Sequence, residues 1–188
     1  TLARKQVVVD VFINNAGFGD YGKFKSSKLE TQTNMIQLNI TALTELAYGF
    51  LKQANPKRKS YLVNLGSVAS FIPGPYMSVY CATKAYVLSF SEALAEELKG
   101  TSTSVTCICP GATKTSFQAR AGLKGSSTQS GIPTAKELAE FGYEQIFAKK
   151  VVAVHGVQNK VLANIVRFLP RSVIRSFASN ALKRSVAT

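Results

Sequence analysis

Two side chains near the middle of the chain have the types and the spacing to move a proton. Tyr80 and Lys84 stand four residues apart in the stretch Tyr-Cys-Ala-Thr-Lys, which places both on one face of a helix. A free phenol has a pKa of about 10 and is a poor proton donor or acceptor at neutral pH. Because a neighbouring ammonium group favours the phenolate, we expect Lys84 to lower the pKa of Tyr80 toward the working pH.

This spacing alone is not specific, because two more of the seven tyrosines have a lysine four residues later. These pairs are Tyr21 with Lys25 and Tyr48 with Lys52. Tyr80 differs from both because a predicted strand leads into a serine, Ser67, thirteen residues before it. The intervening segment contains Pro-Gly-Pro and can turn back, which would bring the hydroxyl group of Ser67 to the phenol.

The hydrophobic pattern predicts the elements that position these side chains. Four apolar runs rich in β-branched residues predict buried strands, at 7–13, 61–65, 105–109 and 151–154. Three stretches with apolar residues at helical spacing predict helices, at 34–51, 80–98 and 135–147. This alternation predicts parallel strands that are joined by crossover helices.

Small and polar residues follow three of the predicted strands. The stretches are Asn14-Asn15-Ala16-Gly17, Gly66-Ser67 and Pro110-Gly111-Ala112-Thr113. In a doubly wound sheet, ligands bind beyond the carboxyl ends of the strands, and small residues there allow close approach to the backbone. The three stretches outline one binding site on this interpretation, although Gly and Asn are also common in ordinary turns.

Taken together and in order, these motifs resemble the short-chain dehydrogenase/reductase family over roughly residues 7–150. The motifs are Asn14-Asn15-Ala16-Gly17, then Asn39, Ser67, Tyr80 with Lys84, and Pro110-Gly111 with Thr115. The resemblance implies an α/β fold with a doubly wound, Rossmann-like parallel sheet. It also implies an NAD(P)(H)-dependent oxidoreductase that interconverts a ketone and a secondary alcohol, on a substrate that is lipophilic or carries an acyl group.

The resemblance assigns a catalytic role to four residues. Tyr80 would be the general acid in ketone reduction, or the base in the reverse direction, and Lys84 would lower its pKa and hold the cofactor ribose. Ser67 would bind and orient the substrate oxygen. Asn39 would position a water molecule in a proton relay to Lys84, or else be a polar residue on a packing helix.

The resemblance also assigns the cofactor site, which Tyr80 and Lys84 would share. Asn15, Ala16 and Gly17 are similar to the turn that lines the adenosine side. Pro110, Gly111, Thr113 and Thr115 are similar to the segment around the nicotinamide carboxamide. The cofactor is NADP or NAD on this basis, with NADP preferred, and it carries the hydride chemistry.

The chain departs from the family at its amino side, where the first three strands and the glycine-rich phosphate turn are missing. Residues 1–156 would therefore form a partial catalytic domain, and the run at 7–13 would be an exposed apolar sheet edge. We expect a fragment of a longer enzyme. The alternative is a catalytically inactive binding or scaffold protein built on a truncated fold, because dinucleotide affinity suffers without the phosphate turn.

Two further segments have predicted roles. Residues 116–133 are rich in Gly, Ser and Thr and fall where the family places its substrate lid, although a plain solvent loop would look the same. Residues 157–188 carry six basic and no acidic side chains on an amphipathic pattern. This helical tail could lie on an anionic membrane, or pack on its own domain or a second subunit.

Composition also bears on the partners, the location and the metal content of the protein. The net charge of +13 suits an anionic partner, but no basic stripe interleaved with aromatic residues is present, so we expect no nucleic acid. Three cysteines are too few for a disulfide framework and favour a cytoplasmic location, with the tail as a peripheral membrane contact. His155, the only histidine, has no partner at ligand spacing, so no metal site is expected. Helices 34–51 and 80–98 are the candidates for pairing in a homo-oligomer.

Overall fold

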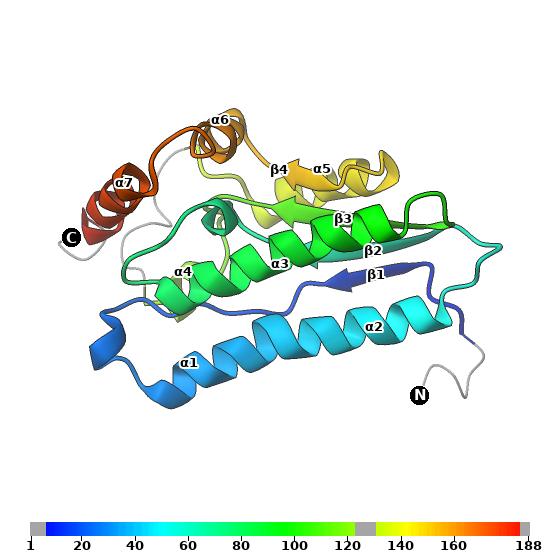
Figure 1. The fold of residues 1–188 in the computed structure, drawn as a ribbon, viewed down its shortest axis with the longest axis horizontal. Helices are drawn as coiled ribbons and strands as arrows, with labels where there is room; N and C mark the ends of the chain where they lie inside the picture. Colours follow the sequence, from blue (N-terminus) through cyan, green and yellow to red (C-terminus); the bar gives the residue numbers. More distant parts are fainter. Residues whose placement is uncertain (1–6, 123–130, 185–188) are drawn as a thin grey trace.

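Four parallel strands form the centre of the molecule (Figure 1). The computed structural model describes residues 7–122 and 131–184. The strands lie in sequence order: β1 (Val11–Asn14), β2 (Ser60–Leu65), β3 (Thr103–Cys109) and β4 (Val152–Val154). Because all four run in the same direction, their carboxyl ends meet at one edge of the sheet, as predicted.

Helices cover both faces of this sheet, which confirms the predicted doubly wound, Rossmann-like architecture. On one face lie α2 (Leu43–Gln53) and α3 (Ser78–Glu97), where Leu62 and Val105 pack against Phe50 of α2. On the other face lies α5 (Ala135–Phe147), where Val63 and Ile108 pack against Ile146. Successive strand residues point to opposite faces, so the mainly apolar strands supply two cores.

The last crossover has the opposite hand to the two before it. The connections from β1 to β2 and from β2 to β3 place their helices on the same face while the sheet grows in one direction. The connection from β3 to β4 continues in that direction, but its helix α5 lies on the other face. Parallel crossovers are right-handed in nearly all proteins, so this inversion is a specific feature of the fold.

Most predicted elements differ from the observed ones by one or two residues at an end, and two differ by more. Strand β1 starts at Val11 and not at residue 7, because β2 begins at Ser60 and first pairs Val11 with Tyr61. The predicted helix at 34–51 starts earlier, with α1 (Leu29–Ile36), and reaches α2 through a π-helical turn, η3 (Gln37–Ala42). The free edge of β1 is apolar and exposed, as predicted, since half of the Ile13 side chain faces solvent.

The remaining elements are short or belong to the tail. They are η2 (Phe24–Ser26), η4 (Val68–Phe71), α4 (Phe117–Arg120), α6 (Val157–Ile165) and α7 (Arg171–Arg184). The tail does form two helices, and α7 packs on its own domain through buried Ile174 and Ala178 and a hydrogen bond from the Tyr21 hydroxyl to the Leu182 carbonyl. Phe168 and Phe177 remain exposed, so membrane contact stays a prediction, as does pairing with a second subunit. Within residues 7–122 and 131–184, no helix has the length and hydropathy needed to cross a membrane.

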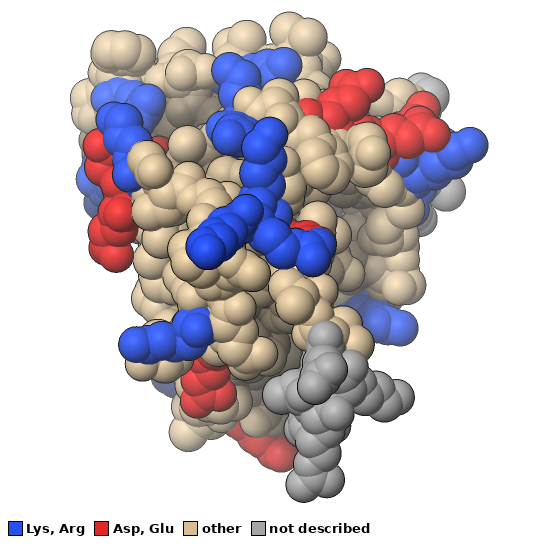
Figure 2. All heavy atoms as spheres, turned by 90° about the vertical axis from the view of Figure 1, so that its right-hand side faces the viewer, with Lys and Arg blue, Asp and Glu red and all other residues tan. Residues whose placement is uncertain are grey.

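Part of the positive charge lies far from the strand carboxyl ends. Figure 2 views the end of the molecule where the strands begin, and Lys and Arg side chains gather near the middle of this face. The turn between α2 and β2 carries three consecutive basic residues, Lys57, Arg58 and Lys59, and Arg58 pairs with Asp10. This charge therefore has no place in a site at the opposite edge of the sheet.

The core on the α2 and α3 face should dominate stability. Leu62 is fully buried, so Leu62→Ala should lower the free energy of unfolding by about 2–5 kcal/mol, because the neighbouring side chains cannot refill the space. Leu46→Ala on α2 is the control, since Leu46 is half exposed, and it should change stability by no more than about 0.5 kcal/mol. Urea unfolding measures both, and equal losses would contradict this core assignment.

Candidate active site

The loops that follow β1, β2 and β3 come together at the carboxyl edge of the sheet. The amide of Val68, after β2, donates a hydrogen bond of 2.9 Å to the carbonyl of Pro110, after β3. Beneath them, the side-chain amide of Asn14 donates to Asn64 at 2.9 Å, and Asn64 donates to Ser91 of α3 at 3.0 Å. These buried polar contacts fix β1, β2 and α3 relative to one another below the predicted site.

Ser67 is held by a local cap at the start of η4. Its Oγ accepts a hydrogen bond from the Ala69 amide at 3.1 Å, and its own amide donates to Ser70 Oγ at 3.2 Å. Ser70 in turn donates to the backbone carbonyl of Lys84 at 2.8 Å. The capping box therefore orients Ser67 and ties it to the turn of α3 that carries the lysine.

Tyr80 lies in a hydrophobic environment with its phenol beside Ser67. Its side chain is buried against Met35 and Met77, and its ring centroid is 5.4 Å from that of Phe117. This burial raises the pKa of Tyr80 to about 12, because a charged phenolate is poorly solvated there, while the nearby Ser67 side chain acts in the opposite direction. Ser67 thus lies near the phenol, and its role in orienting a substrate oxygen stays a prediction.

Lys84 is buried one turn further along α3. Its Nζ donates a hydrogen bond of 2.7 Å to the carbonyl of Leu65, the last residue of β2, and lies 5.9 Å from the centre of the Tyr80 ring. Burial lowers the pKa of Lys84 to about 8.

The expectation that Lys84 lowers the pKa of Tyr80 is wrong for this arrangement. Burial penalises the charged form of both groups, and it outweighs every other influence on Tyr80. The influence that lowers the pKa of the phenol comes from the Ser67 hydroxyl, whereas the lysine donates to a backbone carbonyl. The pair is therefore poised to keep a proton on the phenol.

Asn39 lies in the π-helical turn and joins two parts of the site. Its Oδ1 accepts from the Phe18 amide at 3.1 Å, and its Nδ2 donates to the Phe18 carbonyl at 2.9 Å and to Thr83 Oγ1 at 3.1 Å. It thereby links the loop after β1 to the residue before Lys84, and π-helical turns often occur at functional sites. Its role with a water molecule stays a prediction.

The predicted cofactor residues are placed around this centre. A Cβ atom on Gly17 would lie 3.0 Å from Asn39 Oδ1 and 3.7 Å from Lys84 Nζ, so this backbone lies directly beside both catalytic candidates. Asn15 and Ala16 precede it and are exposed at the end of β1. Pro110, Gly111, Thr113 and Thr115 form a second group after β3.

The segment after β3 makes local contacts. Thr113 Oγ1 donates to the Gly111 carbonyl at 3.2 Å, and Thr115 Oγ1 accepts from the Phe117 amide at 3.2 Å. None of the hydrogen bonds found in the described residues joins these threonines to Tyr80. The segment contacts Tyr80 instead through Phe117, whose ring packs against the Tyr80 ring. Their predicted contact with a nicotinamide stays a prediction.

The predicted lid at 116–133 is described only in part, because residues 123–130 lie outside the described residues. Its two ends are joined, since the Lys114 amide donates to the Pro133 carbonyl at 2.8 Å and Lys114 forms a parallel bridge with Thr134. Helix α4, at the start of the segment, places Phe117 on Tyr80. Closure over a substrate stays a prediction.

Two residues that hold the site were not singled out from the sequence. Ser70 completes the cap around Ser67, and the Ser-x-x-Ser spacing was a readable signal for it. Thr83 accepts from Asn39 and donates to the Tyr80 carbonyl at 2.8 Å. Its position inside the Tyr-Lys stretch gave no signal, because the partner is distant in the sequence.

The residues present fit the ribose and nicotinamide end of a dinucleotide. An ammonium group has three N–H donors, and the hydrogen bond to Leu65 uses one of them, so Lys84 has donors for ribose hydroxyl groups. The missing side chain of Gly17 leaves the backbone open next to that ammonium. For a metal the donor set does not fit, since no group of three His, Cys, Asp or Glu side chains gathers anywhere in the described chain.

Comparison with known proteins gives the same outline. Residues 2–124 match the family model described as short chain dehydrogenase. A 3-oxoacyl-acyl-carrier-protein reductase of Haemophilus influenzae is 28% identical over 138 residues, which cover 70% of this chain and 57% of that protein. A protein named inactive 2-(S)-hydroxypropyl-CoM dehydrogenase 2, of Xanthobacter autotrophicus, is 32% identical over 99 residues, covering 53% and 43%.

A solved structure agrees with the fold as well. A short-chain dehydrogenase from Sphingobium yanoikuyae in complex with NADPH has a TM-score of 0.73 and 31% identity, covering 85% of this chain and 63% of that one. Judged from the two curated relatives, the chain spans about half the length of the proteins it matches.

The burial of Lys84 predicts a pH dependence of stability. Its pKa is about 8 in the folded chain and 10.5 as a free side chain, so the unfolded chain binds more protons in this window. The free energy of unfolding of the wild type minus that of Lys84→Met should therefore rise from pH 8 to pH 10, because groups common to both proteins cancel. Urea unfolding at a series of pH values measures it, and a difference that does not change with pH would contradict the buried ammonium.

Proposed function

This chain belongs to the short-chain dehydrogenase family, and from that premise we propose that it is an NAD(P)(H)-dependent oxidoreductase that interconverts a ketone and a secondary alcohol. The observation that carries the proposal is the meeting of the Ser67 hydroxyl and the Tyr80 phenol, with Lys84 one helical turn away, at the strand carboxyl ends. Three side chains that can hold a carbonyl oxygen and deliver a proton converge there.

Tyr80 acts as the proton donor to the ketone oxygen. Its pKa of about 12 keeps the phenol protonated at neutral pH, which a general acid requires. Ser67 donates a hydrogen bond to the same oxygen and stabilises the negative charge that develops on it. The nicotinamide, when bound, would supply the hydride to the carbonyl carbon, and Tyr80 and Ser67 hold the carbonyl oxygen and so determine how that carbon is oriented.

Lys84 holds the cofactor and replaces the proton that Tyr80 gives up. Its pKa of about 8 lies near neutrality, so it can both carry and release a proton under working conditions. Its fixed position on the Leu65 carbonyl leaves donors for the ribose hydroxyl groups. Asn39 keeps α3 against the loop after β1, where we place the adenosine side of the cofactor, at Asn15, Ala16 and Gly17.

The cofactor and substrate class follow from the surroundings. We propose NADP, because the structural relative from Sphingobium yanoikuyae was solved with NADPH. Met77 and Phe117 flank the Tyr80 ring, which favours a ketone with an apolar substituent. The relative from Haemophilus influenzae is named as a reductase of 3-oxoacyl groups, which fits the same class.

Removal of the Tyr80 hydroxyl tests the proposal. In the full-length protein, Tyr80→Phe should lower the rate of NADPH-dependent ketone reduction by about 100-fold to 10,000-fold, since the proton donor is lost. Tyr48→Phe is the matched control, because Tyr48 is exposed and also has a lysine, Lys52, four residues later, with its Nζ 5.4 Å from the ring centre. The absorbance of NADPH follows the reaction, and Tyr48→Phe should leave the rate unchanged.

Two outcomes would contradict the proposal. Full activity of Tyr80→Phe would exclude this phenol as the acid. Absence of both activity and NADPH binding by calorimetry in the full-length wild type would instead favour a non-catalytic binding or scaffold protein.

A further inference from the structure

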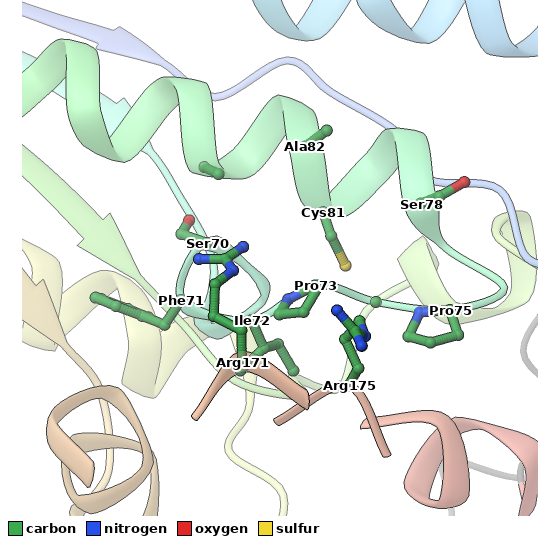
Figure 3. Close-up of a pocket in the computed structure, with 12 residues that line it drawn as sticks. Ser70, Phe71, Ile72, Pro73, Pro75, Ser78, Cys81, Ala82, Arg171 and Arg175 are labelled. Atoms are coloured by element: carbon green, nitrogen blue, oxygen red, sulfur yellow. The ribbon is translucent and has the colours of Figure 1, made fainter. Parts of the chain in front are cut away.

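A cavity lies against a face of α3 other than the one that carries Tyr80 and Lys84. It has a volume of about 390 Å³, at the lower end of the range for small-molecule sites, and lies between α3, the loop 70–75 and the start of α7 (Figure 3). Neither Ser67, Tyr80 nor Lys84 lines it. Cys81 and Ala85 line it instead, so the same helix serves the catalytic centre with one face and this cavity with another.

The lining combines an apolar floor with two guanidinium groups. Phe71, Ile72 and Ala85 form the apolar floor. Arg171 and Arg175, one helical turn apart on α7, extend toward α3 at the mouth of the cavity (Figure 3). The part of the chain that the structure describes contains all ten acidic side chains, and none of them lines the cavity or pairs with either arginine. Two like charges one turn apart repel each other, and an anion between them would remove that repulsion.

The position of the two arginines is fixed by the packing of α7. Ile174 lies between them in the sequence and is buried, and Ala178 follows it one turn later and is also buried. The Tyr21 hydroxyl donates a hydrogen bond of 2.7 Å to the Leu182 carbonyl and anchors the far end of the helix. The guanidinium groups are therefore presented by a docked helix and not by a loose tail.

We propose that this cavity binds an amphiphilic anion, with a carboxylate or phosphate head held between Arg171 and Arg175 and an apolar chain on the floor formed by Phe71, Ile72 and Ala85. Guanidinium groups match the planar, two-oxygen edge of both kinds of head, and the apolar wall gains from burial of the chain. The site lies outside the proposed catalytic centre and does not depend on it.

Calorimetry of the full-length protein with octanoate, octyl phosphate, octanol and inorganic phosphate tests this site. Octanoate or octyl phosphate should bind saturably with one molecule per chain, and octanol and inorganic phosphate should bind at least about tenfold more weakly, because each lacks either the charge or the chain. A preference between the first two identifies a fatty acid or a phosphorylated lipid as the source of the ligand.

The variants separate this cavity from general attraction to a basic protein. The double variant Arg171→Gln with Arg175→Gln should weaken binding at least about tenfold, since charge-assisted hydrogen bonds are lost. The matched control, Arg167→Gln with Lys183→Gln, removes the same charge from the same tail outside the cavity and should leave binding unchanged. Ala85→Leu should weaken binding with both arginines intact, because it fills the floor.

Several results would overturn the proposal. Equal losses in the two double variants would show attraction to net charge only, and no saturable binding in the wild type would show no site. Competition between octanoate and NADPH, with the arginine variant unaffected, would place the ligand in the catalytic centre. NADPH binding itself should be the same in all these variants, so a failure of the proposed function is seen separately.

Discussion

The buried ammonium of Lys84 is the interaction around which the rest of the site is arranged. Burying a charge is expensive unless it is hydrogen-bonded, and here the carbonyl at the end of β2 provides the acceptor. That acceptor is available because the backbone of β2 leaves its strand at Leu65 and turns into Gly66 and Ser67. Three further contacts then hold α3 at this place, from Ser70 to the Lys84 carbonyl, from Asn39 to Thr83, and from Asn64 to Ser91. The pKa of Lys84 is lowered to about 8 because these contacts hold the ammonium group away from water.

The sequence was enough to predict the parallel sheet and the helices that cover it, because these depend on local patterns. Apolar runs with β-branched residues predict buried strands, and parallel strands place their carboxyl ends together. The direction of the Tyr80 pKa shift could not be predicted in this way. Tyr48 and Tyr80 have the same lysine spacing, yet Tyr48 is 64% exposed and Tyr80 is 8% exposed. Depth of burial determines which effect prevails, and it depends on side chains such as Phe117 and Met35 that arrive from distant segments.

Contacts between distant segments explain the other differences as well. Asn39 and Thr83 are 44 residues apart, so no periodicity in the sequence links them. Ser70 is different, because its bond to Ser67 is local and the cap pattern is readable. The start of β1 at Val11 is a tertiary effect too, since residues 7–10 have the composition of a strand but no strand lies beside them. The inverted hand of the crossover to β4 likewise follows from where α5 packs, on Val63 and Ile108.

Helix α3 carries residues of both the catalytic centre and the cavity beside α7. Ser70 lines the cavity beneath α7 and also donates its hydroxyl to the Lys84 carbonyl, so a single side chain contacts both sites. Cys81 lines the same cavity and follows Tyr80 directly, and a Cβ atom on the neighbouring Gly74 would overlap its sulfur atom. Close packing of this kind allows little adjustment, because interiors are as dense as organic crystals. A helix packed this closely therefore gives the cavity lining and the catalytic side chains one shared support.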